Sequence, residues 1–358
     1  MSLGKKKILS QAAAAAAGAS GYFNIATYQT EGAAYSHTGL GFKPDLLWIK
    51  RRNGTSDHYW FDSTRGVGKA VLLNTNVYAE ITNAQYQTAF GDDGFTIGTN
   101  STLSGSGNTY VAWCFKANGG TTSTNSDGTI NTTIQTNSDF GATSPFSILK
   151  YQGNGTFNAT IGHGLGQQVK FAIFKNLDSG TYNYVYYDGL SGSNYNLYMN
   201  TADQEQADGV LQGGGTSTLT LGTSTAVNGN GTNYLCYAWA NISGVQKFGT
   251  YGGNSSTSNT IYTTDNGTSG GANGFQPSMV VIKNIGGGDN WYILDDQRVN
   301  SALPAVNVLY PNLTNAEADN IGGNGEYSMN FLSNGFELKE ITAGYNQTGQ
   351  NYFYWAIA

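Results

Sequence analysis

One pattern of strands is written three times along this chain of 358 residues, and this internal repeat constrains the fold more than any other feature of the sequence. Each copy closes on a segment that opens with Asn and alternates aromatic with smaller apolar residues. The closing segments are residues 108–116, 233–240 and 351–358. They recur at intervals of roughly 120 residues, the length of a small domain rather than of a solenoid unit. A module copied three times builds surface or length more often than it builds one active site.

Two other elements recur in each copy ahead of the closing segment. One is a nearly continuous apolar run that ends in Lys, at residues 41–50, 166–175 and 274–283. The other is an aromatic run that ends in Asp, at residues 58–62, 184–188 and 291–295. The terminal residues of these aromatic runs are predicted to be equivalent: Asp62, Asp188 and Asp295. Alternating segments predict strands with one buried face, and continuous apolar runs predict strands covered on both faces.

The fold class follows from the shortness of these segments. Strand candidates are bounded by Gly, Asn, Asp and Ser, and helical periodicity is confined to the N-terminus, which indicates an all-β protein. We expect three tandem β-sandwich modules, jelly-roll or lectin-like, after a short Ala-rich helix or arm. The expected boundaries are 1–20 for an N-terminal assembly segment and then 21–119, 120–243 and 244–358 for the modules.

Composition limits the classes of partner. Only 11% of the residues are charged and 50 are Gly, which is typical of a rigid β-protein with many tight turns. A net charge of −6 argues against nucleic-acid binding, which needs a basic stripe. No run of apolar residues is long enough to insert into a membrane. Cys114 and Cys236 lie in closing segments of different modules, so we expect two buried free thiols rather than a disulfide.

The N-terminal segment has the outline of a signal peptide, with a basic start and an apolar run. That run is only weakly hydrophobic, because it is mostly Ala and contains Ser10 and Gln11. Alanine favours helix, yet an isolated helix this short is marginal in water. We therefore expect an assembly segment that packs against another subunit, with a retained signal sequence as the alternative. Its leading residues are Lys5, Lys6, Lys7, Ile8 and Leu9.

Residues with catalytic or metal-binding potential do not form a recognisable constellation. His37 and His163 occupy matching turns where the third copy has Asn273, which favours a turn-stabilising hydrogen bond over a catalytic base. Adjacent carboxylates at 92–93 and 295–296 lie in turns or at strand ends, and nothing nominates them as a glycosidase pair. No EF-hand loop, P-loop or nucleophile elbow is present. We expect no catalytic residue, no metal and no cofactor, and therefore no enzyme.

The functional hint that remains is an abundance of Tyr and Asn along the strands of the second copy. Aromatic rings beside amide groups suit contact with sugars or with another protein, because they offer large area at low entropic cost. The alternative is that the rings are cross-strand pairs that hold the sheets together. The candidates for surface binding are Tyr182, Tyr184, Tyr195 and Tyr198.

Several framework motifs carry a resemblance. They are Gly153-Asn-Gly-Thr156 with His163-Gly-Leu-Gly166, Gly274-Phe-Gln-Pro277 with Val280-Val-Ile-Lys283, Trp291-Tyr-Ile-Leu-Asp-Asp-Gln-Arg298, Ser333-Asn-Gly-Phe336 and the closing segments. Through these motifs the chain, from about residue 20 onward, resembles a family of virion structural proteins from tailed bacteriophages, many of them marine. The resemblance implies a tail-fibre, tail-associated or capsid-decorating role, and it brings no catalytic residues.

The sequence and the resemblance together predict a non-enzymatic virion protein on the exposed surface of a phage particle. We expect it to bind other virion proteins and to form a homo-oligomer, with a trimer favoured, and its surface tyrosines to contact host-surface glycan. A capsid decoration or head-fibre protein is the alternative within this class. A polysaccharide depolymerase and a secreted bacterial adhesin are the alternatives from other classes.

Overall fold

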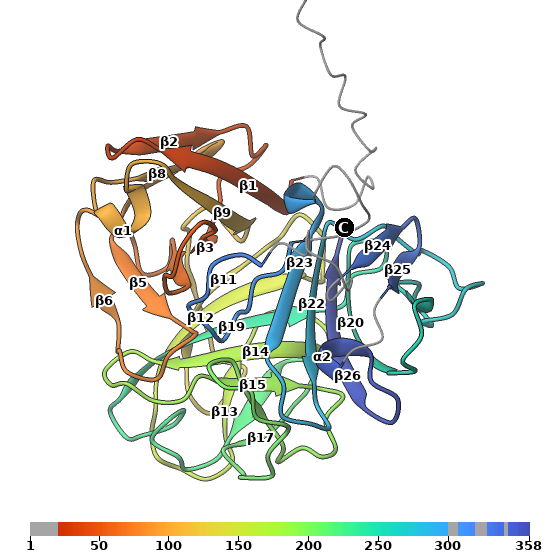
Figure 1. Ribbon diagram of the computed structural model, residues 1–358. Helices are drawn as coiled ribbons and strands as arrows, with labels where there is room; N and C mark the ends of the chain where they lie inside the picture. The colour runs from red at the N-terminus through yellow and green to blue at the C-terminus, as the bar shows by residue number, and fades with distance from the viewer. Residues whose placement is uncertain (1–20, 300–306, 319–327, 340–342) are drawn as a thin grey trace, which may run out of the picture.

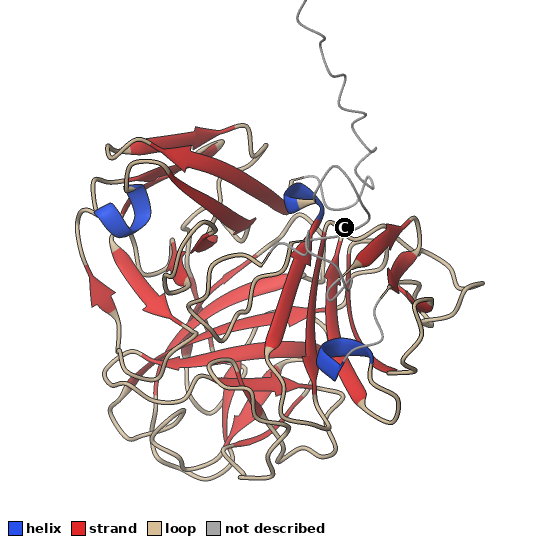
Figure 2. Cartoon of the chain, viewed as in Figure 1, coloured by secondary structure: helices blue, strands red, loops and turns tan. Residues whose placement is uncertain are grey.

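The computed structural model describes residues 21–299, 307–318, 328–339 and 343–358. The fold is all-β, as predicted: strands β1 to β26 form six antiparallel sheets, and each repeat contributes one large and one small sheet (Figures 1 and 2). Each of these sheets draws its strands from a single repeat. The helical elements in the described ranges are short: α1 (Ser101–Ser104), the 3-10 turn η1 (Asp296–Arg298) and α2 (Ala343–Asn346).

In the first repeat the large sheet has the strand order β1-β9-β3-β4-β5-β6 and the small sheet the order β2-β8-β7. The large-sheet strands are β1 (Phe23–Thr30), β9 (Asn108–Phe115), β3 (Leu46–Arg51), β4 (Tyr59–Asp62), β5 (Lys69–Leu72) and β6 (Ile81–Thr82). The small-sheet strands are β2 (Tyr35–Thr38), β8 (Gly94–Ile97) and β7 (Gln87–Gly91).

In the second repeat the orders are β10-β11-β12-β19-β14-β15-β16 and β13-β18-β17. The large-sheet strands are β10 (Ser123–Asn125), β11 (Thr132–Thr136), β12 (Phe146–Gln152), β19 (Asn233–Ala240), β14 (Val169–Asn176), β15 (Tyr184–Tyr187) and β16 (Leu197–Tyr198). The small-sheet strands are β13 (Ala159–Gly162), β18 (Thr218–Leu221) and β17 (Leu211–Gly214).

In the third repeat the orders are β20-β26-β22-β23 and β21-β25-β24. The large-sheet strands are β20 (Gln246–Gly252), β26 (Asn351–Ile357), β22 (Met279–Asn284) and β23 (Trp291–Asp295). The small-sheet strands are β21 (Asn259–Tyr262), β25 (Gly335–Leu338) and β24 (Met329–Leu332). In all three repeats the closing strand therefore pairs on one side with the apolar strand that carries the Lys and on the other with an earlier strand of its repeat, β1, β12 or β20.

The two faces of each large sheet have different roles. In the first and second repeats one face packs on the small sheet and encloses a local core, and Cys114 and Cys236 lie in these cores as buried free thiols, as predicted. The opposite faces of the three large sheets meet in one shared core. This is why the apolar strands β3, β14 and β22 are buried along almost their whole length. Figure 1 shows the three repeats grouped around this centre.

Aromatic side chains fill the shared core. All six Trp residues of the chain are buried, at most 1% exposed. At the centre, Phe115, Trp239 and Trp355 come one from each repeat, and their ring centroids are 6.1, 5.6 and 5.0 Å apart. Burial of large aromatic rings is the main favourable contribution to such an interface. The repeats are therefore three parts of one folded unit, joined through the faces that a separate domain would expose.

Strand register corrects one predicted equivalence. Leu46, Phe171 and Met279 each lie four residues before the terminal Lys, and they pair with Asp62, Tyr187 and Asp295 respectively. The prediction that Asp188 matches the other two Asp residues is therefore wrong by one position. β15 ends at Tyr187, and Asp188 is exposed in the turn that follows.

A polar contact is repeated at the three boundaries between repeats. It begins where β4, β15 and β23 start, at His58, Asn183 and Trp291, whose backbone N–H groups donate to the side-chain oxygens of Asn residues. These acceptors are Asn74, Asn200 and Asn312, at 2.9, 2.8 and 3.0 Å.

The side chains of the same three residues reach into the neighbouring repeat. Trp48 Nε1 donates to His58 Nδ1 (2.8 Å), so His58 Nε2 carries the proton and donates to the carbonyl oxygen of Tyr310 (3.0 Å). The Asn183 amide donates to the carbonyl oxygen of Leu73 and Trp291 Nε1 to that of Tyr198, both at 2.9 Å. The first repeat thus contacts the third, the second the first, and the third the second, which closes a ring.

Candidate functional site

Three of the four predicted surface tyrosines come together on the second repeat. Tyr184 in β15 lies directly opposite Tyr198 in β16, the edge strand of the large sheet, and their ring centroids are 5.1 Å apart in an edge-to-face contact. Tyr182 lies just before β15, and its ring is 5.0 Å from that of Tyr198. Tyr182 is 46% exposed, Tyr198 is half-buried and Tyr184 is buried. The rings that can meet a ligand are therefore those of Tyr182 and Tyr198, and Tyr184 supports them.

Tyr195 is not part of this tyrosine cluster (Tyr182, Tyr184 and Tyr198). It lies in the turn before β16, where its N–H donates to the carbonyl oxygen of Gly192 (3.0 Å), and its ring is half-buried. Among the described residues, it forms no ring pair with the other three tyrosines. The four tyrosines are close in sequence, but the turn points one of them elsewhere.

Asp208 extends the tyrosine cluster and was not predicted. The Tyr198 hydroxyl donates to Asp208 Oδ2 (2.8 Å), and the N–H of Val210 donates to Asp208 Oδ1 (3.1 Å). Burial raises the pKa of Tyr198, and the hydrogen bond to Asp208 raises it further; burial also raises the pKa of Tyr184 to about 12. Both hydroxyls are therefore neutral donors at physiological pH. Asp208 follows β16 in an irregular segment, where no periodic pattern in the sequence singles it out.

Asn196 is the second residue that sequence reasoning missed. Its backbone is paired with Gln206 in both directions, at 2.9 and 2.8 Å, and its side chain is 0% exposed. A side-chain hydrogen bond between the amide and the Tyr198 hydroxyl lowers the pKa of that hydroxyl. A buried amide thus supports the Tyr198–Asp208 pair from inside the fold.

The lysines that end the apolar strands lie buried at the boundaries between repeats. Lys50 Nζ donates to the carbonyl oxygen of Thr314 (3.2 Å), and Lys283 Nζ donates to that of Ala202 (3.0 Å), each in the neighbouring repeat. Lys175 Nζ has no partner within the described ranges. Burial lowers the pKa to about 8 for Lys50 and Lys175 and to about 7 for Lys283. These amines are structural groups of the ring interior rather than a solvent-facing site.

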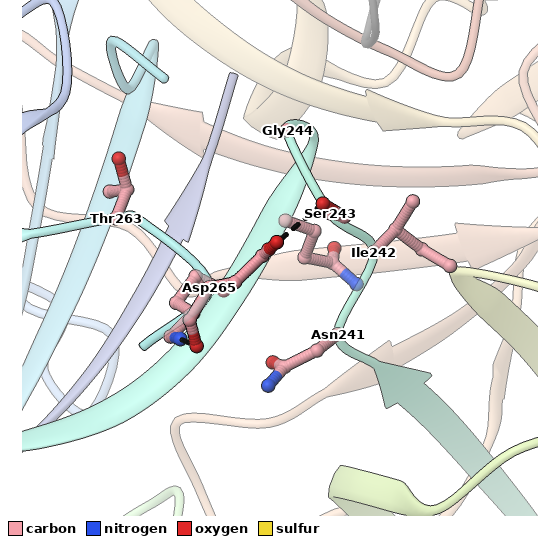
Figure 3. A pocket seen from close by; sticks show the side chains of 8 residues that line it. Asn241, Ile242, Ser243, Gly244, Thr263 and Asp265 are labelled. Carbon is pink, nitrogen blue, oxygen red and sulfur yellow. Dashed lines mark hydrogen bonds between the residues drawn. The ribbon is translucent and has the colours of Figure 1, made fainter. Parts of the chain in front are cut away.

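A small polar pocket lies where the second repeat joins the third (Figure 3). Its volume is about 120 Å³, and its walls are residues 241–244, Gln246, Lys247, Thr263 and Asp265. Figure 3 shows the hydrogen bond from Ser243 to Asp265 (2.8 Å). Lys247 Nζ donates to the carbonyl oxygens of Thr264 and Asp265 (2.9 and 2.6 Å). Because its charged groups are already paired, this pocket offers little to a ligand.

The histidines have structural partners. His163 Nδ1 accepts from the N–H of Leu165 (3.1 Å), which is the predicted turn-stabilising bond, and burial lowers the pKa of His163 to about 4. His37 instead lies in β2 beside the Tyr35 hydroxyl (3.2 Å), and Asn273 adopts φ 55° and donates to Asp265. Across the described ranges no group of His, Cys, Asp and Glu is arranged to hold a metal ion.

The expected assembly segment, with Lys5, Lys6, Lys7, Ile8 and Leu9, lies outside the described residues. In the ranges that the structure describes, the helices are too short to cross a membrane.

Comparison with known proteins places the chain in a family without assigning it an activity. A family described as a domain of unknown function, DUF7483, matches residues 18–358. The chain belongs to this family. The match covers all three repeats, so the DUF7483 domain is the whole ring and not one of its modules. No curated protein matches, and no solved structure matches either.

Proposed function

We propose that this chain is a non-enzymatic structural protein of a bacteriophage virion, a tail-fibre or tail-associated component that displays a glycan-contacting surface. The resemblance described above supplies the class of particle. The observation that carries the display role is the exposed Tyr182 ring, held by Tyr198 on a sheet edge of a closed three-repeat ring. A rigid unit of three packed repeats holds a surface side chain in a fixed position, as a receptor-contacting protein requires.

The charge pattern supports an exposed structural role. Few residues are charged, and several charged groups are used inside the fold: Arg65 pairs with Asp62, Arg298 with Asp295, and all four side chains are at most 1% exposed. A surface with few ion pairs depends little on salt, because screening weakens exposed charge interactions far more than buried contacts. This suits a protein that meets seawater or other variable media.

Binding is favoured over hydrolysis at the tyrosine cluster. A glycosidase needs two carboxylates on either side of the scissile bond. Among the described residues, the rings of the cluster have one carboxylate in hydrogen-bond contact, that of Asp208. Asp62 and Asp295 are both buried beside Arg residues and face the interior. We therefore propose a contact surface for glycan and no depolymerase activity.

Imaging of intact particles by cryo-electron microscopy tests the proposed function. The three-repeat ring is large enough to be fitted into density, and the proposal expects it in projections from the tail. Density tiled over the capsid shell would establish a decoration protein instead and would remove the receptor-contacting role. Absence of the chain from purified particles, shown by mass spectrometry, would contradict a virion protein altogether and favour the secreted adhesin.

A further inference from the structure

We propose that Tyr182 and Asp208 form a binding site for a neutral sugar, with Tyr182 as the stacking platform and Asp208 as the hydrogen-bonding group. This inference rests on the proposed function and specifies its ligand. The site lies on the open edge of the second repeat, where β16 is the last strand of the sheet.

The platform is a ring that is exposed and held in place. Tyr182 is 46% exposed, and its ring packs against Tyr198, which packs in turn against the buried Tyr184. Tyr78 and Phe157 are as exposed, at 47% and 58%, but neither forms a ring pair in the part of the chain that the structure describes. A ring fixed by its neighbours loses little entropy when a sugar ring stacks on it, so Tyr182 is the best prepared of the three.

The carboxylate beside the platform has spare capacity. Asp208 is exposed and accepts one hydrogen bond at each oxygen, from the Tyr198 hydroxyl and the Val210 N–H. An ionised carboxylate offers about four acceptor positions, so roughly two remain for hydroxyl donors. Bonds to a charged acceptor are stronger than bonds between neutral groups. Neighbouring hydroxyls of one sugar ring match such an acceptor.

The Asn196 amide supports this pair from inside the fold. The residue is 0% exposed, so a ligand does not reach it, and its side-chain hydrogen bond with the Tyr198 hydroxyl lowers the pKa of that group. The amide and the Tyr184 ring together hold Tyr198 in place, and Tyr198 in turn holds the Tyr182 ring and the Asp208 carboxylate.

The charges at the site select the class of sugar. The charged group bonded to the tyrosine cluster is the exposed carboxylate of Asp208, which accepts from the Tyr198 hydroxyl (2.8 Å). The chain as a whole carries a net charge of −6. A carboxylate of a uronic or sialic acid would be repelled by the like charge of Asp208. The site therefore fits neutral hexoses with free hydroxyls.

The test uses the full chain on an array of neutral gluco-, galacto- and manno-oligosaccharides printed beside uronic-acid and sialylated ones, followed by calorimetric titration with the best neutral binder. We expect binding to neutral sugars, and a loss of roughly tenfold or more in affinity for Tyr182→Ala and for Asp208→Asn. Phe157→Ala and Tyr78→Ala are the matched controls, with an affinity change below about twofold. Equal melting temperatures show that all four variants fold.

Each outcome decides the proposal. Binding to neutral sugars that both cluster variants weaken supports it. Preference for acidic sugars, binding that the two variants leave unchanged, or no binding to any neutral sugar overturns it. Particle imaging separates this result from the proposed function. If the chain lies on the tail but binds no sugar, only the sugar site is contradicted. If the chain binds sugar but is absent from particles, only the virion role is contradicted.

Discussion

At the scale of single residues, the buried lysine of the second repeat differs from its two counterparts. Carboxylates act on Lys50 (Asp57 and Glu317) and on Lys283 (Asp289 and Asp203) and partly offset the effect of burial. For Lys175 burial alone lowers the pKa, and the amine has no hydrogen-bond partner among the described residues. Among these three lysines, Lys175 is therefore the one whose desolvation is uncompensated.

Replacement of this lysine by an apolar residue of similar length should stabilise the protein. A folded pKa of about 8 against roughly 10.4 for a free lysine corresponds to a cost of roughly 3 kcal/mol at pH 7. We expect Lys175→Met to raise the free energy of unfolding in urea by up to that amount. Lys150→Met, at a half-exposed position in β12, is the control and should change it by less than about 0.5 kcal/mol. Destabilisation by Lys175→Met would show that the amine has a partner after all.

The three lysines also show which properties of single residues the sequence predicts and which it does not. The repeat places Lys50, Lys175 and Lys283 at matching strand ends, and the sequence identifies them as equivalent. It does not show that they are buried, because a Lys that ends a strand is usually solvated. Burial comes from the neighbouring repeat, whose carbonyl groups reach two of the three amines. Asn196 and Asp208 were missed for a similar reason, since irregular segments place them beside Tyr198.

At the scale of elements, two of the three aromatic strands end in a buried ion pair that the third lacks. β4 ends at Asp62, which accepts from Arg65 and from the Tyr237 hydroxyl (2.8 Å) of the second repeat. β23 ends at Asp295, which accepts from Arg298 (2.7 Å) and from Trp113 Nε1 (3.0 Å) of the first repeat.

The second repeat has an aromatic contact at this position. Tyr187 lies where the other repeats have Asp, and its ring is 4.6 Å from that of Phe353 in the third repeat. The sequence suggests Asp188 instead because the aromatic run ends there. Register depends on how β14 and β15 pair, which spacing along the chain does not determine. The existence of the strands was therefore predictable, but not their equivalence residue by residue.

Loss of one buried carboxylate charge should destabilise the ring strongly. Asp62→Asn and Asp295→Asn each remove the fully buried carboxylate of an Arg and leave it one other partner, Glu80 for Arg65 and Glu317 for Arg298. We expect a loss of roughly 3 kcal/mol in the free energy of unfolding, the lower end of the cost of breaking a buried pair. Asp188→Asn breaks only the part-exposed pair with Lys170 and should cost less than about 1 kcal/mol. Chemical denaturation of the three variants checks the difference. Equal costs would mean that the buried pairs do not hold the repeats together.

At the scale of the whole molecule, the buried ionisable groups predict an alkaline optimum of stability. The folded pKa of the three junction lysines is about 7 to 8, below that of unfolded lysine. Between these values the unfolded chain binds more protons, so stability rises with pH. Buried tyrosines such as Tyr28 and Tyr237 have a raised pKa, so stability falls once unfolded tyrosines ionise near pH 10.

Urea unfolding across a pH series checks this balance. We expect the largest free energy of unfolding between about pH 8 and 10, with a decline on either side. Lys175→Met should reduce the rise between pH 7 and 10, because one of the three lysines no longer contributes to it. A maximum near pH 6 in the parent chain would mean that the lysines are solvated or paired in the folded state.

The shared core also explains why the sequence predicted three modules but did not predict that they pack into one folded unit. Both faces of the closing strands are apolar, as in Tyr234-Leu-Cys-Tyr-Ala-Trp239, and one-dimensional spacing cannot say whether the second face meets a small sheet or a neighbouring repeat. The structure assigns Cys236 to the local core of the second repeat, and Tyr237 and Trp239 to the shared core.

Scanning calorimetry of the full chain is the most direct measurement of whether the three repeats form one unit. If the repeats unfold together around Phe115, Trp239 and Trp355, one transition is expected, with equal calorimetric and van't Hoff enthalpies. The enthalpy should be roughly 250 kcal/mol for a chain of this length. Trp239→Ala should then lower the whole transition without splitting it. Two or three separate transitions, each with about a third to a half of that enthalpy, would contradict a single cooperative ring.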